Sequence, residues 1–232
     1  MNSRSDAGGP SAVLWDMDGT LVDTEPFWMV AETELVESFG GTWTHQDAVE
    51  LVGNGLLDSA AVLQRAGVDM EAEAIVQHLT DRVTDALRTQ GVPFRPGARE
   101  LLADLRAAGI PTALVTMSLR RMAEGVVGLI DFDAFDHIVA GDDVSQPKPH
   151  PEPYLRAAEL LGIDIADAVV IEDSRTGLAA GLASGAVTLG VPHIVPLDDA
   201  GAHALWPTLS GRTTDDIVAL HREGRLASEA AR

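Results

Sequence analysis

The stretch Val13-Leu14-Trp15-Asp16-Met17-Asp18-Gly19-Thr20 joins a short apolar run to two aspartates one residue apart, followed by a glycine. The apolar run is typical of a buried strand, on which residues two apart point the same way. Asp16 and Asp18 would therefore lie close together unless the chain turns between them, and Gly19 permits that turn. Two carboxylates in one pocket repel, so either a cation lies between them or their protonation states differ. Both alternatives indicate a chemical site.

Composition limits the class of protein. With 232 residues, 46% of them hydrophobic, the chain can form one large domain or a core plus a smaller domain. Residues 1–10 fit neither a signal peptide nor a membrane anchor, and no run approaches the ~20 apolar residues of a membrane helix. We therefore expect a cytoplasmic protein with no membrane partner. The absence of cysteine excludes disulfides, thiolate catalysis and cysteine-ligated metals.

The chain is strongly acidic, with a formal net charge of -20 at pH 7. This charge argues against a nucleic-acid partner, which requires clustered lysine and arginine. An anionic substrate would be repelled at long range, so its site must supply concentrated positive charge. Lys148 is the one lysine beside fifteen arginines. It either fills a position that needs a compact ammonium or reflects codon bias.

Short runs of aliphatic and β-branched residues alternate with amphipathic stretches, a pattern that predicts a parallel sheet with helices on both faces. The predicted strands are 11–15, 110–116, 137–140, 168–171 and 186–191. The predicted helices between them are 97–108, 119–129, 151–162 and 175–184. The fold class is therefore α/β, with a Rossmann-like, doubly wound core.

The first two predicted strands are separated by roughly 90 residues, far more than a single crossover requires. Most of this segment has helical spacing of apolar residues. The helices predicted in it are 26–39, 48–53, 57–66 and 71–90. We therefore predict an all-helical cap domain over residues 23–92, inserted into a core built from residues 1–22 and 93–232.

Four groups of polar residues fall at the carboxyl ends of predicted strands, the edge at which open α/β sheets bind ligands. They are Asp16 with Asp18, Thr116, Lys148, and Glu172 with Asp173. Each alone can be explained as a helix cap or a solvated loop charge, but their joint placement is much harder to explain in that way. Four carboxylates at one edge need a hard cation such as Mg²⁺ beside the ammonium group. This set suits phosphoryl transfer through an aspartyl-phosphate.

In chain order, Asp16-x-Asp18-Gly-Thr20, Thr116, Lys148 and Glu172-Asp173 resemble the four motifs of the haloacid dehalogenase-like (HAD) superfamily. Lys148-Pro-His-Pro-Glu-Pro and Glu172-Asp-Ser-x-x-Gly177 resemble the branch that contains β-phosphoglucomutase and sugar-phosphate phosphatases. That branch carries a helical cap of the C1 type after the first motif. The excess helices lie at the same place in this sequence.

The resemblance implies a role for each motif residue. Asp16 attacks phosphorus, and Asp18 protonates the leaving oxygen and then activates water. The phosphoryl oxygens are held by Thr116, Met117 and Lys148. Mg²⁺ is bound by Asp16, the Asp18 carbonyl and Asp173, with Glu172 acting through a water. Because dehalogenases of the family lack the second aspartate, the presence of Asp18 disfavours dehalogenation.

The cap sequence separates phosphatases from phosphomutases in this branch. In β-phosphoglucomutases a histidine after the first motif couples cap closure to proton transfer; the corresponding residue here is Trp28, which has no proton to transfer. The arginine that grips a second phosphate in those enzymes corresponds to Leu56, three residues after Gly53. The segment around Glu25 and Trp28 instead resembles phosphatases of sugar or polyol phosphates.

We therefore expect a Mg²⁺-dependent phosphatase for a small phosphorylated metabolite. Trp28 would cover the apolar face of the substrate and Glu25 would bind a hydroxyl; packing within the cap is the alternative for both. Two other functions stay open: a phosphomutase that uses Arg82 or another arginine for a second phosphate, and a catalytically silent binding protein of the same fold. We expect a monomer, with a dimer as the alternative.

Overall fold

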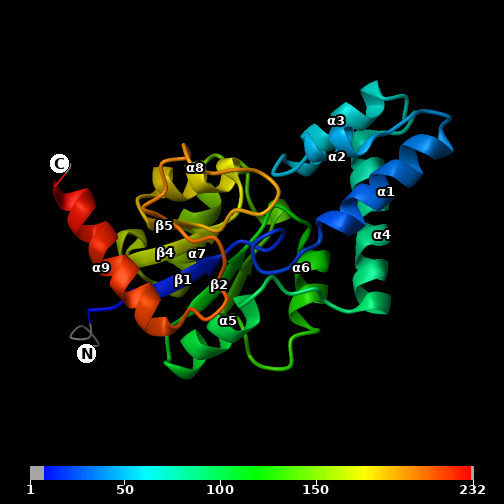
Figure 1. The fold of residues 1–232 in the computed structure, drawn as a ribbon. Helices are drawn as coiled ribbons and strands as arrows, with labels where there is room; N and C mark the ends of the chain where they lie inside the picture. The colour runs from blue at the N-terminus through cyan, green and yellow to red at the C-terminus, as the bar shows by residue number, and fades with distance from the viewer. Residues whose placement is uncertain (1–7, 231–232) are drawn as a thin grey trace.

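A computed structural model describes residues 8–230 (Figure 1). Its core is a six-stranded parallel sheet in the order β3-β2-β1-β4-β5-β6. The strands are β1 (Ala12–Trp15), β2 (Thr112–Val115), β3 (His137–Val139), β4 (Ala168–Glu172), β5 (Val187–Gly190) and β6 (Ala204–Leu205). Val13 of β1 pairs with Thr112 on one side and Val169 on the other. The winding direction reverses at β1, and the crevice beyond its carboxyl end is where such sheets bind ligands.

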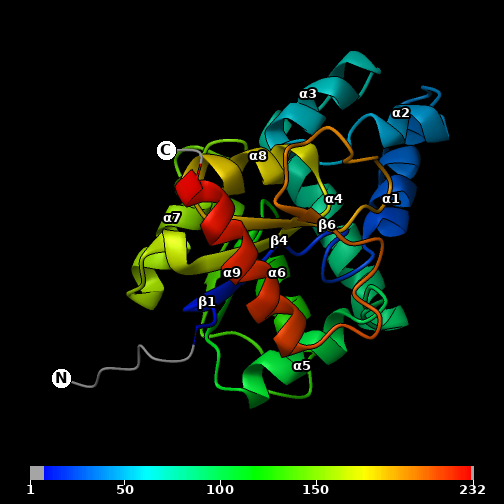
Figure 2. The ribbon, with the colours of Figure 1, turned by 60° about the vertical axis from the view of Figure 1, so that its left-hand side comes forward.

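Helices cover both faces of the sheet. In the described residues these are α5 (Ala98–Ala107), α6 (Arg120–Val127), α7 (Glu152–Leu161), α8 (Arg175–Ser184) and α9 (Thr214–Ala230), with short 3₁₀ turns η1 (Gly141–Asp143) and η2 (Ile165–Asp167). Val13 and Trp15 belong to the same buried cluster as side chains of α5, α6 and α9, whereas Ala12 and Leu14 cluster with those of α7 and α8. Figure 2 shows α9 crossing one face of the sheet. Successive strand side chains point to opposite faces, so the predicted doubly wound α/β core is confirmed.

The helical cap lies beyond one end of the sheet (Figure 1). It contains α1 (Glu25–Ser38), α2 (His45–Val49), α3 (Leu56–Arg65) and α4 (Ala72–Gln90). The two connections to the core run side by side, because the Asp23 amide donates a hydrogen bond to the Pro93 carbonyl at 2.7 Å. An inserted helical cap is therefore confirmed, while its boundaries at residues 23 and 92 stay predictions.

The predicted helix at residues 48–53 is wrong. The helix in this region is α2 (His45–Val49), and a turn follows it. Thr44 and Asp47 form a capping box in which the Thr44 amide donates to the Asp47 carboxylate at 2.8 Å, and this contact starts the helix earlier. Gly53 has a φ of 79°, a left-handed conformation that closes the turn.

No element is predicted after residue 191, yet β6 and α9 both lie there. β6 is two residues long and too short for an alternating pattern. The start of α9 could have been predicted from Thr213 and Asp216, whose spacing allows the Thr213 amide to donate to the Asp216 carboxylate at 2.9 Å. The buried residues Ile217 and Leu220 also have helical spacing. Within residues 8–230, none of the helices combines the length and the apolar character needed to cross a bilayer.

Candidate active site

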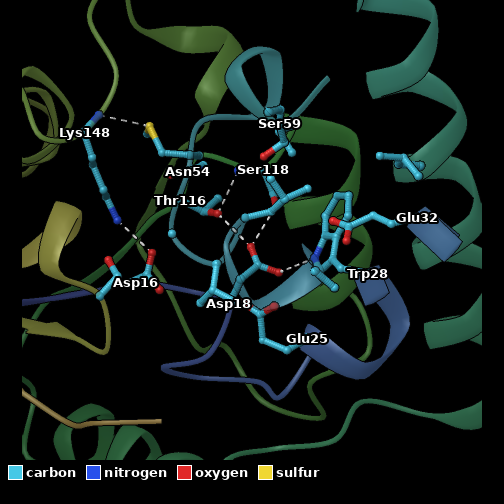
Figure 3. A pocket seen from close by; sticks show the side chains of 18 of the residues that line it. Asp16, Asp18, Glu25, Trp28, Glu32, Asn54, Ser59, Thr116, Ser118 and Lys148 are labelled. Carbon is cyan, nitrogen blue, oxygen red and sulfur yellow. Dashed lines mark hydrogen bonds and ion pairs between the residues drawn. The ribbon is translucent and has the colours of Figure 1, made fainter. Parts of the chain in front are cut away.

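The turn after β1 separates the two aspartates. The Met17 carbonyl accepts hydrogen bonds from the amides of Leu21 and Val22, both at 3.0 Å, and Gly19 has a φ of 83°. As a result, Asp16 points toward Lys148, whereas Asp18 points toward the cap side of the cavity (Figure 3). The turn permitted by Gly19 is therefore present, and it gives the two carboxylates different environments.

Lys148 links three strand ends through its ammonium group. Its Nζ donates to Asp16 Oδ1 at 2.7 Å, to Glu172 Oε1 at 2.6 Å and to the Val115 carbonyl at 2.9 Å. Burial opposes the charge of the ammonium, but Asp16 and Glu172 outweigh it and raise the pKa of Lys148. The group is therefore held as a cation, and all three of its N–H donors are used.

Glu172 is completely buried and orients the lysine. Its Oε1 also accepts from the Tyr154 hydroxyl at 2.7 Å, and its Oε2 accepts from Ser174 Oγ at 3.0 Å. Gly177 is the residue that makes room for this carboxylate, since a Cβ there would lie 1.8 Å from Glu172 Oε1. Both oxygens of Glu172 thus have protein partners, an arrangement that suits contact with a metal through water better than direct ligation.

Asp16, Glu172 and Asp173 form a buried carboxylate cluster in which one oxygen from each lies within 4.8 Å of the others. Burial, followed by repulsion from Glu172, raises the pKa of Asp16 to about 7. Burial, then repulsion from Asp16, raises the pKa of Asp173 as well. The single ammonium of Lys148 leaves this cluster with excess negative charge. Oxygen donors of this kind are the ligands that Mg²⁺ prefers, so the residues fit a divalent cation.

Asp18 accepts hydrogen bonds from both the cap side and the core side. Thr24 Oγ1 and Trp28 Nε1 donate to its Oδ1, the latter at 3.4 Å. Ser118 Oγ and Thr116 Oγ1 donate to its Oδ2 at 2.7 and 3.2 Å. Trp28 has no proton to transfer, as the sequence indicates, but its N–H helps to orient Asp18. The carboxylate is thus held at the boundary between core and cap.

These groups surround a cavity of about 100 Å³ between the core and the cap. Its lining from the core includes Asp16, Asp18, Thr116, Met117, Ser118, Lys148 and Asp173, and its lining from the cap includes Glu25, Trp28, Glu32, Leu51, Leu56, Ser59 and Leu79. The cap turn touches the core at this point, because a Cβ on Gly53 would lie 3.2 Å from the Ser174 Cβ. A cavity of this size holds several waters and suits a small metabolite.

The structure brings the predicted core residues together, and Glu25 and Trp28 both reach the cavity. Arg82 is not among the lining residues; it forms an ion pair with Glu34 on the half-exposed side of the cap. Ser118 and Glu32 also line the cavity, and neither is predicted from the sequence. Ser118 could have been predicted as a site residue, because it lies two residues after Thr116 at the end of a predicted strand. In the sequence, Glu32 does not differ from other helical glutamates.

Replacing Gly19 by alanine tests the turn. A Cβ at this position would lie 2.1 Å from Asp173 Oδ2, in addition to the strain of a positive φ. Gly40 is a matched control, because it has a φ of 78° and a Cβ added there would have no neighbouring atom within 4 Å. Gly40→Ala should cost about 1–2 kcal/mol and leave activity intact.

Gly19→Ala should lower the thermal midpoint further and reduce activity about 100-fold, because Asp173 must move. Thermal unfolding and an activity assay measure the two effects. Equal stability and equal activity for the two variants would contradict the proposed crowding.

The fold and the site define a hydrolase class in which a helical cap closes over strand-end aspartates. The model of the haloacid dehalogenase-like hydrolase family matches residues 10–185. The chain belongs to this family, and it is a phosphoric monoester hydrolase, as its phosphatase relatives are.

Three similar proteins illustrate the relationship. A phosphorylated carbohydrates phosphatase of Thermotoga maritima is 32% identical over 203 residues, covering 84% of this chain and 93% of that protein. A bifunctional riboflavin kinase/FMN phosphatase of Arabidopsis thaliana is 31% identical over 79% of this chain, which spans only 49% of that longer relative. The structure of CbbY from Rhodobacter sphaeroides in complex with xylulose-(1,5)bisphosphate has a TM-score of 0.82 at 26% identity, covering 90% of this chain and 99% of the other.

Proposed function

We propose that this chain is a Mg²⁺-dependent phosphatase that hydrolyses a small sugar or polyol phosphate through an aspartyl-phosphate on Asp16. The observation that carries the proposal is the buried contact of Lys148 with Asp16 and Glu172, beside Asp173, on the core side of the cavity between core and cap. The phosphorylated carbohydrates phosphatase of Thermotoga maritima supports this substrate class.

The reaction requires two different roles: Asp16 is the nucleophile, and Asp18 is the general acid and base. A carboxylate oxygen of Asp16 attacks phosphorus, and the bond between phosphorus and the substrate oxygen breaks while Asp18 gives that oxygen its proton. Water then attacks the phosphorus of the aspartyl-phosphate, Asp18 takes a proton from it, and the Asp16 carboxylate leaves. The hydrogen bonds from Thr24 and Ser118 hold Asp18 at the core–cap boundary, where the leaving group would lie.

A divalent cation would be held by Asp16, Asp173 and the main-chain carbonyl of Asp18, with Glu172 contacting it through water. It would neutralise charge on the phosphoryl group and on the carboxylates. Space exists beside Asp173 because Gly19 has no side chain there. Thr20 Oγ1 donates to Asp173 Oδ1 at 3.1 Å and fixes the direction of this carboxylate.

Lys148 supplies the local positive charge that an acidic protein needs for an anionic substrate. All three N–H donors of Lys148 already have acceptors. A phosphoryl oxygen would therefore share with Asp16 the N–H that now donates to Asp16. Thr116 and Met117 would complete the phosphate position at the end of β2, where the Ser118 amide donates to Thr116 Oγ1 at 3.0 Å.

A phosphomutase is less well supported. Arg82 pairs with Glu34 away from the cavity, and the lining position expected to hold an arginine is Leu56. Among the described residues that line the cavity, Lys148 is the only lysine or arginine, so a second phosphate would find no second cation. The intact set of site residues argues against a silent binding protein. Monomeric state, cytoplasmic location and the absence of a nucleic-acid partner stay predictions.

Phosphate release measured on a panel of phosphorylated compounds tests the proposal. With Mg²⁺ we expect release from several sugar and polyol monophosphates and from p-nitrophenyl phosphate; EDTA should abolish it and added Mg²⁺ should restore it. A flat response over the panel would refute the phosphatase. Isomerised sugar phosphate without net phosphate release would identify a phosphomutase instead.

A further inference from the structure

Helix α1 presents three side chains to the cavity at helical spacing. Glu25, Trp28 and Glu32 are three and four residues apart, so they share one face, and all three line the cavity (Figure 3). Trp28 contacts Asp18, which places Glu25 and the start of the helix near the reacting groups. Glu32 lies a full turn beyond Trp28 and therefore deeper in the cap, away from the phosphate position.

Glu32 is buried without a partner. Only 6% of the residue is exposed, and among the described residues its Oε2 has no hydrogen-bond partner. The neighbouring Trp43 indole lowers the pKa of Glu32 against the larger effect of burial, but the Trp43 N–H has no hydrogen-bond partner among the described residues. Burying a carboxyl group without a hydrogen bond is costly, so an incompletely paired carboxyl group in the wall of a cavity points to a partner that enters with a ligand.

The surroundings of Glu32 restrict that partner. The cap part of the cavity combines apolar side chains, with Leu51, Val76 and Leu79 in its wall, and the neutral polar residues Asn54 and Ser59. In residues 8–230, no lysine or arginine of the cap lines it, whereas two carboxyl groups do. A second phosphate or a carboxylate would meet like charge there with no cation of the cap to offset it, which disfavours binding. A hydroxyl can donate to a carboxylate or accept from a carboxylic acid.

We propose that Glu32 is a specificity-determining residue that hydrogen-bonds a hydroxyl at the end of the substrate away from the phosphate. The site then selects monophosphates whose far end is uncharged and hydroxylated, and discriminates against compounds with a carboxylate or a second phosphate there. This inference rests on the proposed phosphatase function and names the substrate class within it.

Two further properties agree with this role. Burial raises the pKa of Glu32 to about 7, so near neutral pH the group can act as either donor or acceptor. The cavity of about 100 Å³ has room for a short hydroxylated chain. A site built to hydrogen-bond a substrate hydroxyl rejects analogues that lack it, because the protein group is then left unpaired.

The test compares kcat/KM for three probes: a polyol monophosphate that is active with the unaltered enzyme, p-nitrophenyl phosphate, and phosphoglycolate. Glu32→Leu should lower kcat/KM for the polyol phosphate about 10- to 100-fold, mainly through KM, because one buried hydrogen bond to a charged group is lost. The value for p-nitrophenyl phosphate, which has no hydroxyl at its far end, should change less than about threefold. Glu32→Gln keeps a hydrogen-bonding group, so kcat/KM for the polyol phosphate should fall less than in Glu32→Leu. The ratio of kcat/KM for the polyol phosphate to that for phosphoglycolate should also fall, because the negative charge that repels phosphoglycolate is gone.

Glu34→Gln is the matched control, since Glu34 lies on the same helix but pairs with Arg82 on the outside. It should leave all three values unchanged. Equal losses on all probes for both Glu32 variants, or an unchanged value for the polyol phosphate, would overturn the assignment of Glu32 alone. No hydrolysis of any probe by the unaltered enzyme would refute the phosphatase function itself, so the two failures are distinguishable.

Discussion

Asp16→Asn is expected to abolish phosphate release, with a fall in kcat of at least about 1,000-fold, because the amide is a poor nucleophile and no other carboxylate can replace it. Asp16 lies 2.7 Å from Lys148, while Glu172 already has partners on both oxygens. Neither Glu172 nor Asp173 follows the carboxyl end of β1, where Asp16 is placed. Retained turnover would contradict the mechanism directly.

The same variant should remain folded. It removes one of three buried carboxylates that repel one another, so the thermal midpoint of the metal-free protein should not fall. The increase in thermal midpoint that Mg²⁺ produces in the unaltered protein should shrink, because one ligand is lost. Asp69→Asn, on the exposed surface, is the control and should preserve both activity and the Mg²⁺ effect.

Lys148→Arg is expected to reduce turnover about 100-fold, because the position needs a compact ammonium. Three acceptors surround Nζ at 2.6 to 2.9 Å, and the residue is only 6% exposed. A planar guanidinium is larger and cannot direct three donors to the same acceptors without moving Asp16. Activity and the thermal midpoint should both be measured.

Lys148→Met extends this test to stability. It leaves Asp16 and Glu172 buried without their cation, and such a loss destabilises a protein by about 3–5 kcal/mol. Arg88→Lys, on the exposed cap surface, is the control for the arginine–lysine exchange and should be neutral. Near-normal activity of Lys148→Arg would show that the single lysine reflects codon bias after all.

Much of the core could be predicted because its signals are local. The run before Asp16 is apolar at every position, as expected for a strand buried on both faces, and Glu172 ends a similar run. Parallel strands place their carboxyl ends at one edge, so polar residues at those ends had to converge. The prediction of a helix over residues 48–53 is wrong because the capping box of Thr44 and Asp47 starts the helix earlier than the apolar residues indicate.

Other features depend on contacts between segments that are distant in the chain. Asp18 meets Ser118 across 100 residues, and Lys148 meets Asp16 across 132 residues. The sequence alone leaves Arg82 as a candidate to bind a second phosphate, but in the folded chain Arg82 forms an ion pair with Glu34. Helical spacing places Glu32 on the same face of α1 as Trp28, but the spacing does not show that this face meets the cavity.

The α/β core, the inserted helical cap and the set of carboxylates with one lysine at a sheet edge can all be predicted from the amino-acid sequence. These follow from periodicity and from the parallel direction of the strands, which are properties of short segments. Three features are visible only in the folded chain: the donors that each carboxylate meets, the different partners of Asp16 and Asp18, and the buried Glu32 Oε2 without a hydrogen bond. The physical reason is that burial and hydrogen bonding depend on how the cap packs against the core, and that packing joins residues with no fixed spacing in the chain.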